Sequence, residues 1–213
     1  MFYWLYERML LSQIQVLPRH ICFMISGEDL VAEPEKCLEV TGWCSGLNTL
    51  PAHTPRSPAA HHPPAIQSLT FHINRLSPGE LTRTLPALRK IASIARLSLH
   101  HGTTEEVAGT GLDVVVAIGK SGREEITDCI RQLARNGVAP SAIDEKVLES
   151  CLTFRYDPDI VVKTGGDHLT DFLIWQSVYS ELFFSDVNWT SFRRVDFLRV
   201  LRDYQSRIRR FGK

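Results

Sequence analysis

Four short apolar runs constrain the fold of this chain more than any other feature of its sequence. They span residues 21–25, 69–73, 112–118 and 159–163. Runs of this length are typical of strands that are buried on both faces, and the segments between them are long enough to hold helices. The sequence therefore predicts an α/β fold, with a mostly parallel central sheet flanked by helices.

Helix-start signals occupy the segments between these runs. Ser77-Pro78-Gly79-Glu80 predicts a helix that runs to about Leu99, and a second helix is expected from about Arg123 to Arg135. Ile143-Asp144 is expected to begin a third, short helix.

The first 17 residues predict an amphipathic helix, because apolar side chains recur in them at helical spacing. This helix either packs on its own domain or lies at a membrane surface, where Trp and Tyr are favoured. Its apolar stretch is shorter than the ~20 residues that span a bilayer. Residues 18–213 are expected to form a single domain, with a Pro/His-rich loop at about 50–64.

Charge and cysteine content restrict the possible functions. Lys+Arg and Asp+Glu both number 24, so the formal net charge is zero and no global field favours nucleic acid. Any anion site must be local. The five cysteines form no Cys-x-x-Cys pair, and their odd number favours reduced thiols in a cytoplasmic protein.

Two glycine turns follow predicted strands. Gly119-Lys120-Ser121-Gly122 is not a P-loop, because that motif needs a glycine where Val114 stands. Thr164-Gly165-Gly166 ends the last apolar run, and its backbone N–H groups are expected to face a ligand.

The C-terminal half of the chain resembles the cis-prenyltransferases, which are the undecaprenyl and dehydrodolichyl diphosphate synthases. The segments that carry the resemblance are Asp157-Pro158-Asp159, Thr164-Gly165-Gly166-Asp167-His168, Phe172-Leu173-Ile174-Trp175-Gln176, Tyr179-Ser180-Glu181-Leu182-Phe183-Phe184 and Arg209-Arg210-Phe211-Gly212. Pro18-Arg19-His20 is similar to the start of the family's domain, whereas residues 33–105 match in layout alone. The resemblance implies the undecaprenyl diphosphate synthase-like fold. It also implies cis condensation of isopentenyl diphosphate onto an allylic diphosphate, with Mg²⁺, in a dimer of α/β subunits.

The end of the first strand departs from the family pattern. Family members carry Asp-Gly-Asn-Arg-Arg here for Mg²⁺ and diphosphate, whereas this chain has Ser26-Gly27-Glu28-Asp29-Leu30. The exchange removes a carboxylate ligand, two positive charges are lost and two negative charges are added. We therefore expect diphosphate to be repelled from this strand end.

A second departure lies after the last apolar run. Asp167-His168-Leu169-Thr170-Asp171 is one residue shorter than the family segment, and the missing residue is the Arg expected to hold isopentenyl diphosphate. Lys163 stands where an Arg is usual, so it offers a point charge in place of a bidentate fork. His168 and Glu181 are candidate metal-site residues. Glu181 matches a family position linked to the metal and interface region, and an ordinary interface salt bridge is the alternative.

The C-terminal tail keeps the family's Arg-x-Gly motif as Arg210, Phe211 and Gly212. The resemblance implies that this motif crosses the dimer interface and completes the partner's active site. An Arg fork can hold a diphosphate bidentately, and a glycine lets its backbone N–H approach the phosphate closely.

These features together predict a non-catalytic accessory subunit of a heteromeric cis-prenyltransferase that makes long-chain polyprenyl diphosphate. The partner is expected to be a homologous catalytic subunit that holds most of the Mg²⁺. The interface is expected at a helix over Phe172–Asp186, with Trp175, Phe183 and Phe184 as apolar anchors.

Two alternatives stay open from the sequence. One is a divergent homodimer that is active alone, in which Glu28 or Asp29 takes over Mg²⁺. The other is a scaffold or receptor that retains only the fold. The chain is expected in the cytoplasm, with peripheral membrane contact through its N-terminal helix as an open question.

Overall fold

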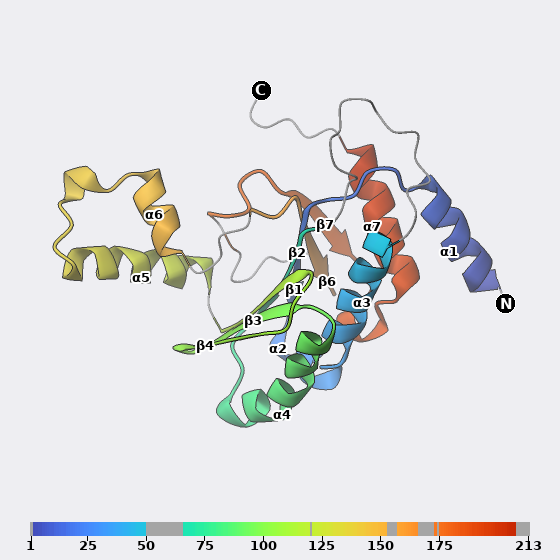
Figure 1. Ribbon diagram of the computed structural model, residues 1–213, viewed down its shortest axis with the longest axis horizontal. Coiled ribbons are helices and arrows are strands. Elements are labelled where there is room, and N and C mark those ends of the chain that lie inside the picture. The colour runs from blue at the N-terminus through green and yellow to red at the C-terminus, as the bar shows by residue number, and fades with distance from the viewer. Residues whose placement is uncertain are drawn as a thin grey trace.

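Helices and strands alternate along the chain in the computed structural model, which describes residues 2–49, 66–119, 121–152, 157–165, 173 and 175–207 (Figure 1). The first half contains α1 (Phe2–Gln13), β1 (His20–Ile25), α2 (Gly27–Ala32), α3 (Lys36–Thr49), β2 (Ser68–Ile73), α4 (Pro78–Arg89), the 3₁₀ turn η1 (Lys90–Ser93), β3 (Arg96–His101) and β4 (Thr104–Ala108). The second half contains β5 (Asp113–Ile118), α5 (Gly122–Arg135), η2 (Pro140–Ala142), α6 (Glu145–Cys151), β6 (Ile160–Thr164), β7 (Glu181–Ser185), η3 (Trp189–Ser191) and α7 (Arg194–Ser206). The predicted loop at 50–64 lies outside the described residues.

The described strands form one sheet in the order β4-β3-β5-β2-β1-β6-β7. β4 pairs with β3 in antiparallel orientation, and every other neighbouring pair is parallel. The four apolar runs of the sequence are β5, β2, β1 and β6, which occupy adjacent places inside the sheet. The predicted α/β class, with a mostly parallel sheet and flanking helices, is therefore confirmed.

Strand β1 sends alternate side chains to two hydrophobic clusters, as the period of a strand requires. Phe23 and Ile25 belong to the larger core, together with side chains of α3 and α7. Cys22 and Met24 belong to a smaller cluster that includes Val161. Figure 1 shows α3 and α7 beside the sheet, whereas α5 and α6 form a pair that extends away from it.

Five buried rings form an aromatic cluster at the centre of the larger core. The Phe23 centroid lies 5.9 Å from Phe71, 5.9 Å from Trp189, 5.8 Å from Phe192 and 6.2 Å from Phe197. Phe23 and Phe71 come from neighbouring strands, and the other three rings come from η3, from the residue that follows it and from α7. The aromatic cluster therefore fixes the C-terminal elements against the middle of the sheet.

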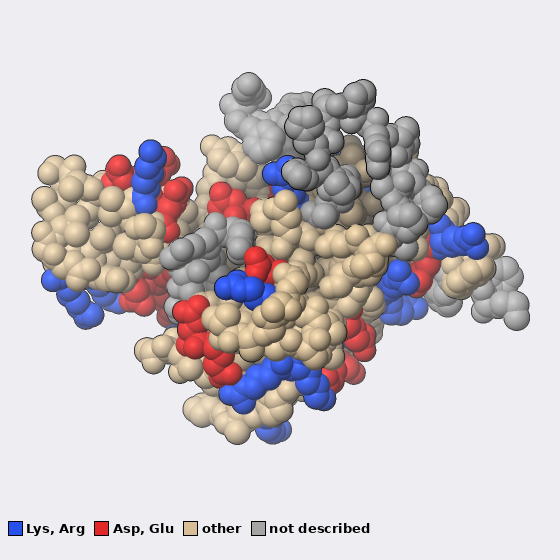
Figure 2. Space-filling model, viewed as in Figure 1, with Lys and Arg blue, Asp and Glu red and all other residues tan. Residues whose placement is uncertain are grey.

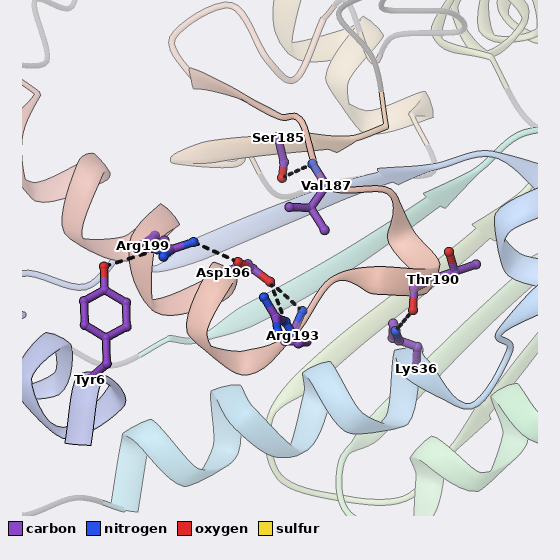
Figure 3. A network of polar contacts seen from close by, with 8 residues as sticks. All are labelled: Tyr6, Lys36, Ser185, Val187, Thr190, Arg193, Asp196 and Arg199. Atoms are coloured by element: carbon purple, nitrogen blue, oxygen red, sulfur yellow. Dashed lines mark hydrogen bonds and ion pairs between the residues drawn. The ribbon is translucent and has the colours of Figure 1, made fainter. Parts of the chain in front are cut away.

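Helix α1 packs on α7 through one of its faces. Leu10 is fully buried, and the Tyr6 hydroxyl accepts a hydrogen bond of 3.3 Å from Nε of Arg199, which lowers the Tyr6 pKa (Figure 3). Arg199 also lies 3.2 Å from the buried carboxylate of Asp196, in the first turn of α7. The face of α1 that carries Tyr6 and Leu10 therefore packs on its own chain, which is one of the two roles expected for the N-terminal helix.

The helix-start signals read from the sequence are confirmed. Ser77 with Glu80 and Ser121 with Glu124 both form capping boxes, in which each side chain bonds the other residue's backbone N–H. Asp144 accepts a hydrogen bond of 2.9 Å from the Val147 backbone at the start of α6.

Two predicted helices are wrong in extent. Helix α4 ends at Arg89, and residues 96–101 form β3, which is paired with β5. The helix expected over Phe172–Asp186 is instead a turn at 175–179 followed by β7, which is paired with β6. In both cases a neighbouring strand supplies backbone partners, and this tertiary pairing overrides the local helical pattern.

We expect Phe23→Ala to lower the free energy of unfolding by about 3–5 kcal/mol, because it leaves a cavity inside the aromatic cluster. Phe184→Ala is the matched control, since Phe184 is 42% exposed, and we expect it to cost about 1 kcal/mol or less. Urea unfolding of the isolated chain measures both. Equal losses for the two variants would contradict a core centred on Phe23.

Candidate functional site

The residues that follow four parallel strands lie together at the carboxyl ends of these strands. Ser26, Asn74, Gly119 and Gly165 come directly after β1, β2, β5 and β6. The Asn74 backbone N–H donates to Ile25, and that of Gly119 donates to the Ile73 carbonyl. Ligands of open α/β sheets bind at this carboxyl edge, so these turns frame the candidate site.

The Gly165 turn is closed on its own chain. Its backbone N–H donates to the carbonyls of Ser185 and Val187, at 3.2 Å each, and its φ of 66° favours glycine. A Cβ at Gly165 would lie 2.8 Å from Oδ1 of Asn188. The expectation that this N–H faces a ligand is therefore wrong for Gly165, because carbonyls at the end of β7 and just after it accept from it. Gly166 lies outside the described residues.

Ser26 and Asp29 are bonded to each other at the end of β1. Ser26 is the N-cap of α2: its Oγ accepts from the Asp29 backbone N–H at 3.1 Å and donates to the Asp29 carboxylate at 2.8 Å. Glu28 is exposed in the same helical turn, and Leu30 is fully buried in the larger core. The residues that replace the family's Asp-Gly-Asn-Arg-Arg thus serve as a helix cap, acidic groups of the first turn and a core side chain.

Two cations near this edge already have partners. Nζ of Lys163, which was predicted to contact diphosphate, instead donates to the Thr164 carbonyl of its own strand at 2.8 Å. Arg75, which follows Asn74, forms an exposed ion pair of 2.9 Å with Glu124 at the start of α5. The first turn of α2, directly after β1, thus carries the carboxylates Glu28 and Asp29, while these two neighbouring cations are bonded within the chain.

Glu181 is the first residue of β7 and lies at the opposite, amino-terminal end of the parallel strands. It is level with Ile160 and Ile21 in the strand register, and Ile21 comes five residues before Ser26, or about 16 Å at ~3.3 Å per residue. The structure does not bring Glu181 together with Ser26, and it pairs Glu181 with Arg207 at 3.5 Å. His168 and the tail Arg210-Phe211-Gly212 lie outside the described residues.

A polar contact missed by the sequence reasoning connects α5 to the turn before β7. Nε2 of Gln176 donates to the Glu125 carboxylate at 3.0 Å, and both side chains are buried. Next to it, a cavity of about 420 Å³ is lined by Trp175 and Asp157 among others, and burial raises the Asp157 pKa. Trp175, expected at an interface, therefore faces this cavity at least in part.

The fit of Mg²⁺ to this edge is poor. Mg²⁺ prefers several oxygen ligands, commonly carboxylates, in octahedral geometry. Within the described part of the chain no three His, Cys, Asp or Glu side chains converge as metal ligands, and the Ser26 hydroxyl donates to Asp29. Among the described helices, none has the length and apolarity needed to cross a bilayer.

Comparison with known proteins identifies the family. Residues 84–212 match the family described as "Putative undecaprenyl diphosphate synthase". The chain is 31% identical over 263 aligned positions to an isoprenyl transferase of Deinococcus radiodurans, covering 99% of this chain and 92% of that protein. The chain belongs to the cis-prenyltransferase family.

Other relatives agree with this membership. An isoprenyl transferase of Thermus thermophilus is 29% identical over 251 positions, covering 99% of this chain and 95% of that protein. Lavandulyl diphosphate synthase of Lavandula x intermedia, solved with dimethylallyl diphosphate, has the same fold: the TM-score is 0.66 at 19% identity, over 92% of this chain and 99% of that one. Both sequence alignments are longer than the 213 residues of this cis-prenyltransferase homologue, so the two relatives carry segments that it lacks.

We expect Ser26→Ala to lower the free energy of unfolding by about 0.5–2 kcal/mol, because the first turn of α2 loses its cap. Ser26→Thr keeps the hydroxyl and is the control, with a smaller loss. Thermal unfolding of the two variants measures the difference. Unchanged stability in Ser26→Ala would show that the Ser26–Asp29 contact does not hold this turn.

Proposed function

We propose that this chain is the accessory, non-catalytic subunit of a heteromeric cis-prenyltransferase. The complex would extend an allylic diphosphate with isopentenyl diphosphate to a long-chain polyprenyl diphosphate, and Mg²⁺ would bind mainly at the partner's site. The observation that carries the proposal is the end of β1, where the Ser26 hydroxyl is bonded to Asp29 and Glu28 lies beside them. Two carboxylates at this point oppose a diphosphate, since the leaving group needs cations and N–H donors.

The proposed contribution to the partner is the tail. Arg210 would hold a diphosphate in the partner's site, and Phe211 and Gly212 would let the backbone approach it. In this arrangement a chain with an acidic site of its own still takes part in catalysis.

The proposed interface is the open edge of β7 and the turn before it. Phe184 is 42% exposed, and Val178 and Tyr179 are more exposed still. Phe183 instead packs against the larger core. Exposed apolar and aromatic side chains on an edge strand and the turn before it suit a subunit contact, because they bury large apolar area when covered.

A second candidate is a divergent homodimer that is active alone. It is favoured by the two relatives named isoprenyl transferase that match nearly their whole length. In it, Glu28 or Asp29 would have to bind Mg²⁺, and the Ser26–Asp29 bond would have to open. A scaffold that retains only the fold is the third candidate, and the persistence of Arg210 and Gly212 speaks against it.

We expect the isolated chain to incorporate no labelled isopentenyl diphosphate, and a co-purified complex with a homologous catalytic subunit to incorporate it. Arg210→Ala should lower turnover of the complex about 10²-fold or more, because a contact to the developing diphosphate charge is lost. Arg202→Ala, on an exposed position of α7, is the control and should leave turnover unchanged. Elongation by the isolated chain at the rate of the complex favours the homodimer, and an Arg210→Ala complex with full turnover favours the scaffold.

We also propose that the complex contacts membrane peripherally through α1, where its lipid product would reside. The face of α1 away from α7 exposes Trp4 (65%), Leu5 (60%) and Met9 (44%), and the Arg8 guanidinium lies 5.6 Å from the Trp4 ring centroid. Figure 2 shows Lys and Arg side chains at the right-hand end of the molecule, where α1 lies in Figure 1. Apolar side chains with a neighbouring Arg suit a surface of anionic lipid.

We expect the chain to sediment with vesicles that contain phosphatidylglycerol more than with pure phosphatidylcholine vesicles. The double variant Trp4→Ser/Leu5→Ser should lower binding about tenfold or more, because two apolar side chains no longer enter the bilayer. Ile94→Ser, another exposed apolar position, is the matched control. Equal binding by both variants would contradict a contact through α1.

A further inference from the structure

Helices α5 and α6 form a helical arm that carries two cysteines. In Figure 1 the pair extends away from the sheet. No described residue of α6 is fully buried, whereas α5 buries Glu125, Cys129 and Leu133 along one face. Segments with little buried surface open most readily. The contacts between the two helices therefore decide how firmly α6 is held.

Cys129 and Cys151 are neighbours across this arm. Sγ of Cys129, on α5, lies 3.7 Å from the Leu148 carbonyl oxygen. Cys151 is the last residue of α6 and comes three positions after Leu148, so it lies on the same side of that helix. Burial and a hydrogen bond with the Cys151 thiol raise the Cys129 pKa to about 11. The two sulfur atoms are thus in contact, and both are free thiols.

The other three cysteines lie on other elements and are shielded from solvent. Cys22 is in β1, Cys37 and Cys44 are in α3, and all three are at most 1% exposed. Burial raises the pKa of each of these thiols, to about 12 for Cys22. Because the thiolate is the reacting form, they are inert. Of the five cysteines, all among the described residues, Cys151 alone is partly exposed.

We propose that Cys129 and Cys151 form a reversible disulfide, with a low-molecular-weight disulfide such as oxidised glutathione as the oxidant. The Cys151 sulfur attacks one glutathione sulfur and forms a mixed disulfide, and the other glutathione leaves as a thiol. Cys129 then attacks the Cys151 sulfur and expels the second glutathione. Both protein thiols are oxidised, one glutathione disulfide is reduced to two thiols, and the two protons pass to the released glutathione.

The order of the two steps follows from the burial of Cys129. This side chain is 2% exposed, so dissolved glutathione cannot reach it. Its attack on Cys151 is intramolecular, and the contact between the two thiols gives it a high effective concentration. Its raised pKa slows this attack, because little of the thiol is ionised. The mixed disulfide should therefore be detectable before the link closes.

A disulfide at this point would fix α6 to the rest of the chain. Glu125, one turn before Cys129 on α5, accepts a hydrogen bond of 3.0 Å from Gln176 in the turn before β7. Glu149 of α6 and Trp175 of that turn line the same cavity of about 420 Å³. The link would hold the α6 wall of this cavity in place, and it would also constrain the unfolded chain. This proposal does not rest on the proposed function.

The test treats the full chain, under native conditions, with mixtures of reduced and oxidised glutathione, followed by alkylation and peptide mass spectrometry. We expect one disulfide, which joins the peptides of Cys129 and Cys151, and recovery of both thiols with dithiothreitol. Amide hydrogen exchange of α6 should slow about tenfold or more in the oxidised chain. Exchange of the β1 amides, in the middle of the sheet, is the control and should change little.

Two variants separate the roles of the two thiols. Cys129→Ala keeps the buried position apolar, and its reaction should stop at the mixed disulfide of Cys151 with glutathione. Cys151→Ser should take up no glutathione, because the remaining thiols are buried.

Four outcomes would overturn the proposal: an unmodified chain that stops at the mixed disulfide, a link to another cysteine, a link that leaves α6 exchange unchanged, or no reaction of any thiol. If Cys129→Ala does not fold, the peptide map and the hydrogen exchange of the unmodified chain still decide.

Discussion

The contact of one β1 side chain with the C-terminal elements governs much of this structure. Phe23 stands in the middle of the sheet and touches rings of β2, η3 and α7 at centroid distances near 6 Å. Aromatic burial of this extent is a large part of the stability of a small domain. Because α7 is placed by this cluster, the position of Arg207 and the origin of the tail depend on the packing of Phe23.

The net charge of the chain is zero, but its charged residues are unevenly distributed along the sequence. Acidic groups gather where α2 begins, at the end of β1, and the basic residues of the sequence's C-terminus follow Arg207. Within a few ångströms a like charge opposes an anion and an opposite charge attracts it, and both effects are screened beyond about 10 Å. In the proposed complex, diphosphate would therefore avoid this chain's own strand end and meet its tail in the partner.

The sequence predicted the central strands well and the edges poorly, for a physical reason. β1, β2, β5 and β6 are buried on both faces and read as apolar runs, whereas β3, β4 and β7 mix polar and apolar residues. Helix starts were predicted because they depend on residues close in sequence. The use of the Gly165 N–H and the separation of Glu181 from Ser26 depend on strand order and register, which no local pattern encodes. The ion pair of Arg207 with Asp203 could be predicted locally, because the two residues are four positions apart on one helix. The contact of Arg207 with β7 could not be predicted in this way.

The residues that replaced the family pattern at β1 have acquired structural roles, and this bears on whether the change is reversible. Ser26 caps α2, and Leu30 is fully buried in the larger core. An arginine at Leu30 would place a charge among apolar side chains, which costs several kcal/mol unless it is paired. A carboxylate at Ser26 would stand next to Asp29, where the two like charges raise each other's pKa. To restore a family-like diphosphate site, this chain would need several coordinated changes, each of which is destabilising alone. That barrier is consistent with the proposed complex, in which diphosphate would bind at the partner's site.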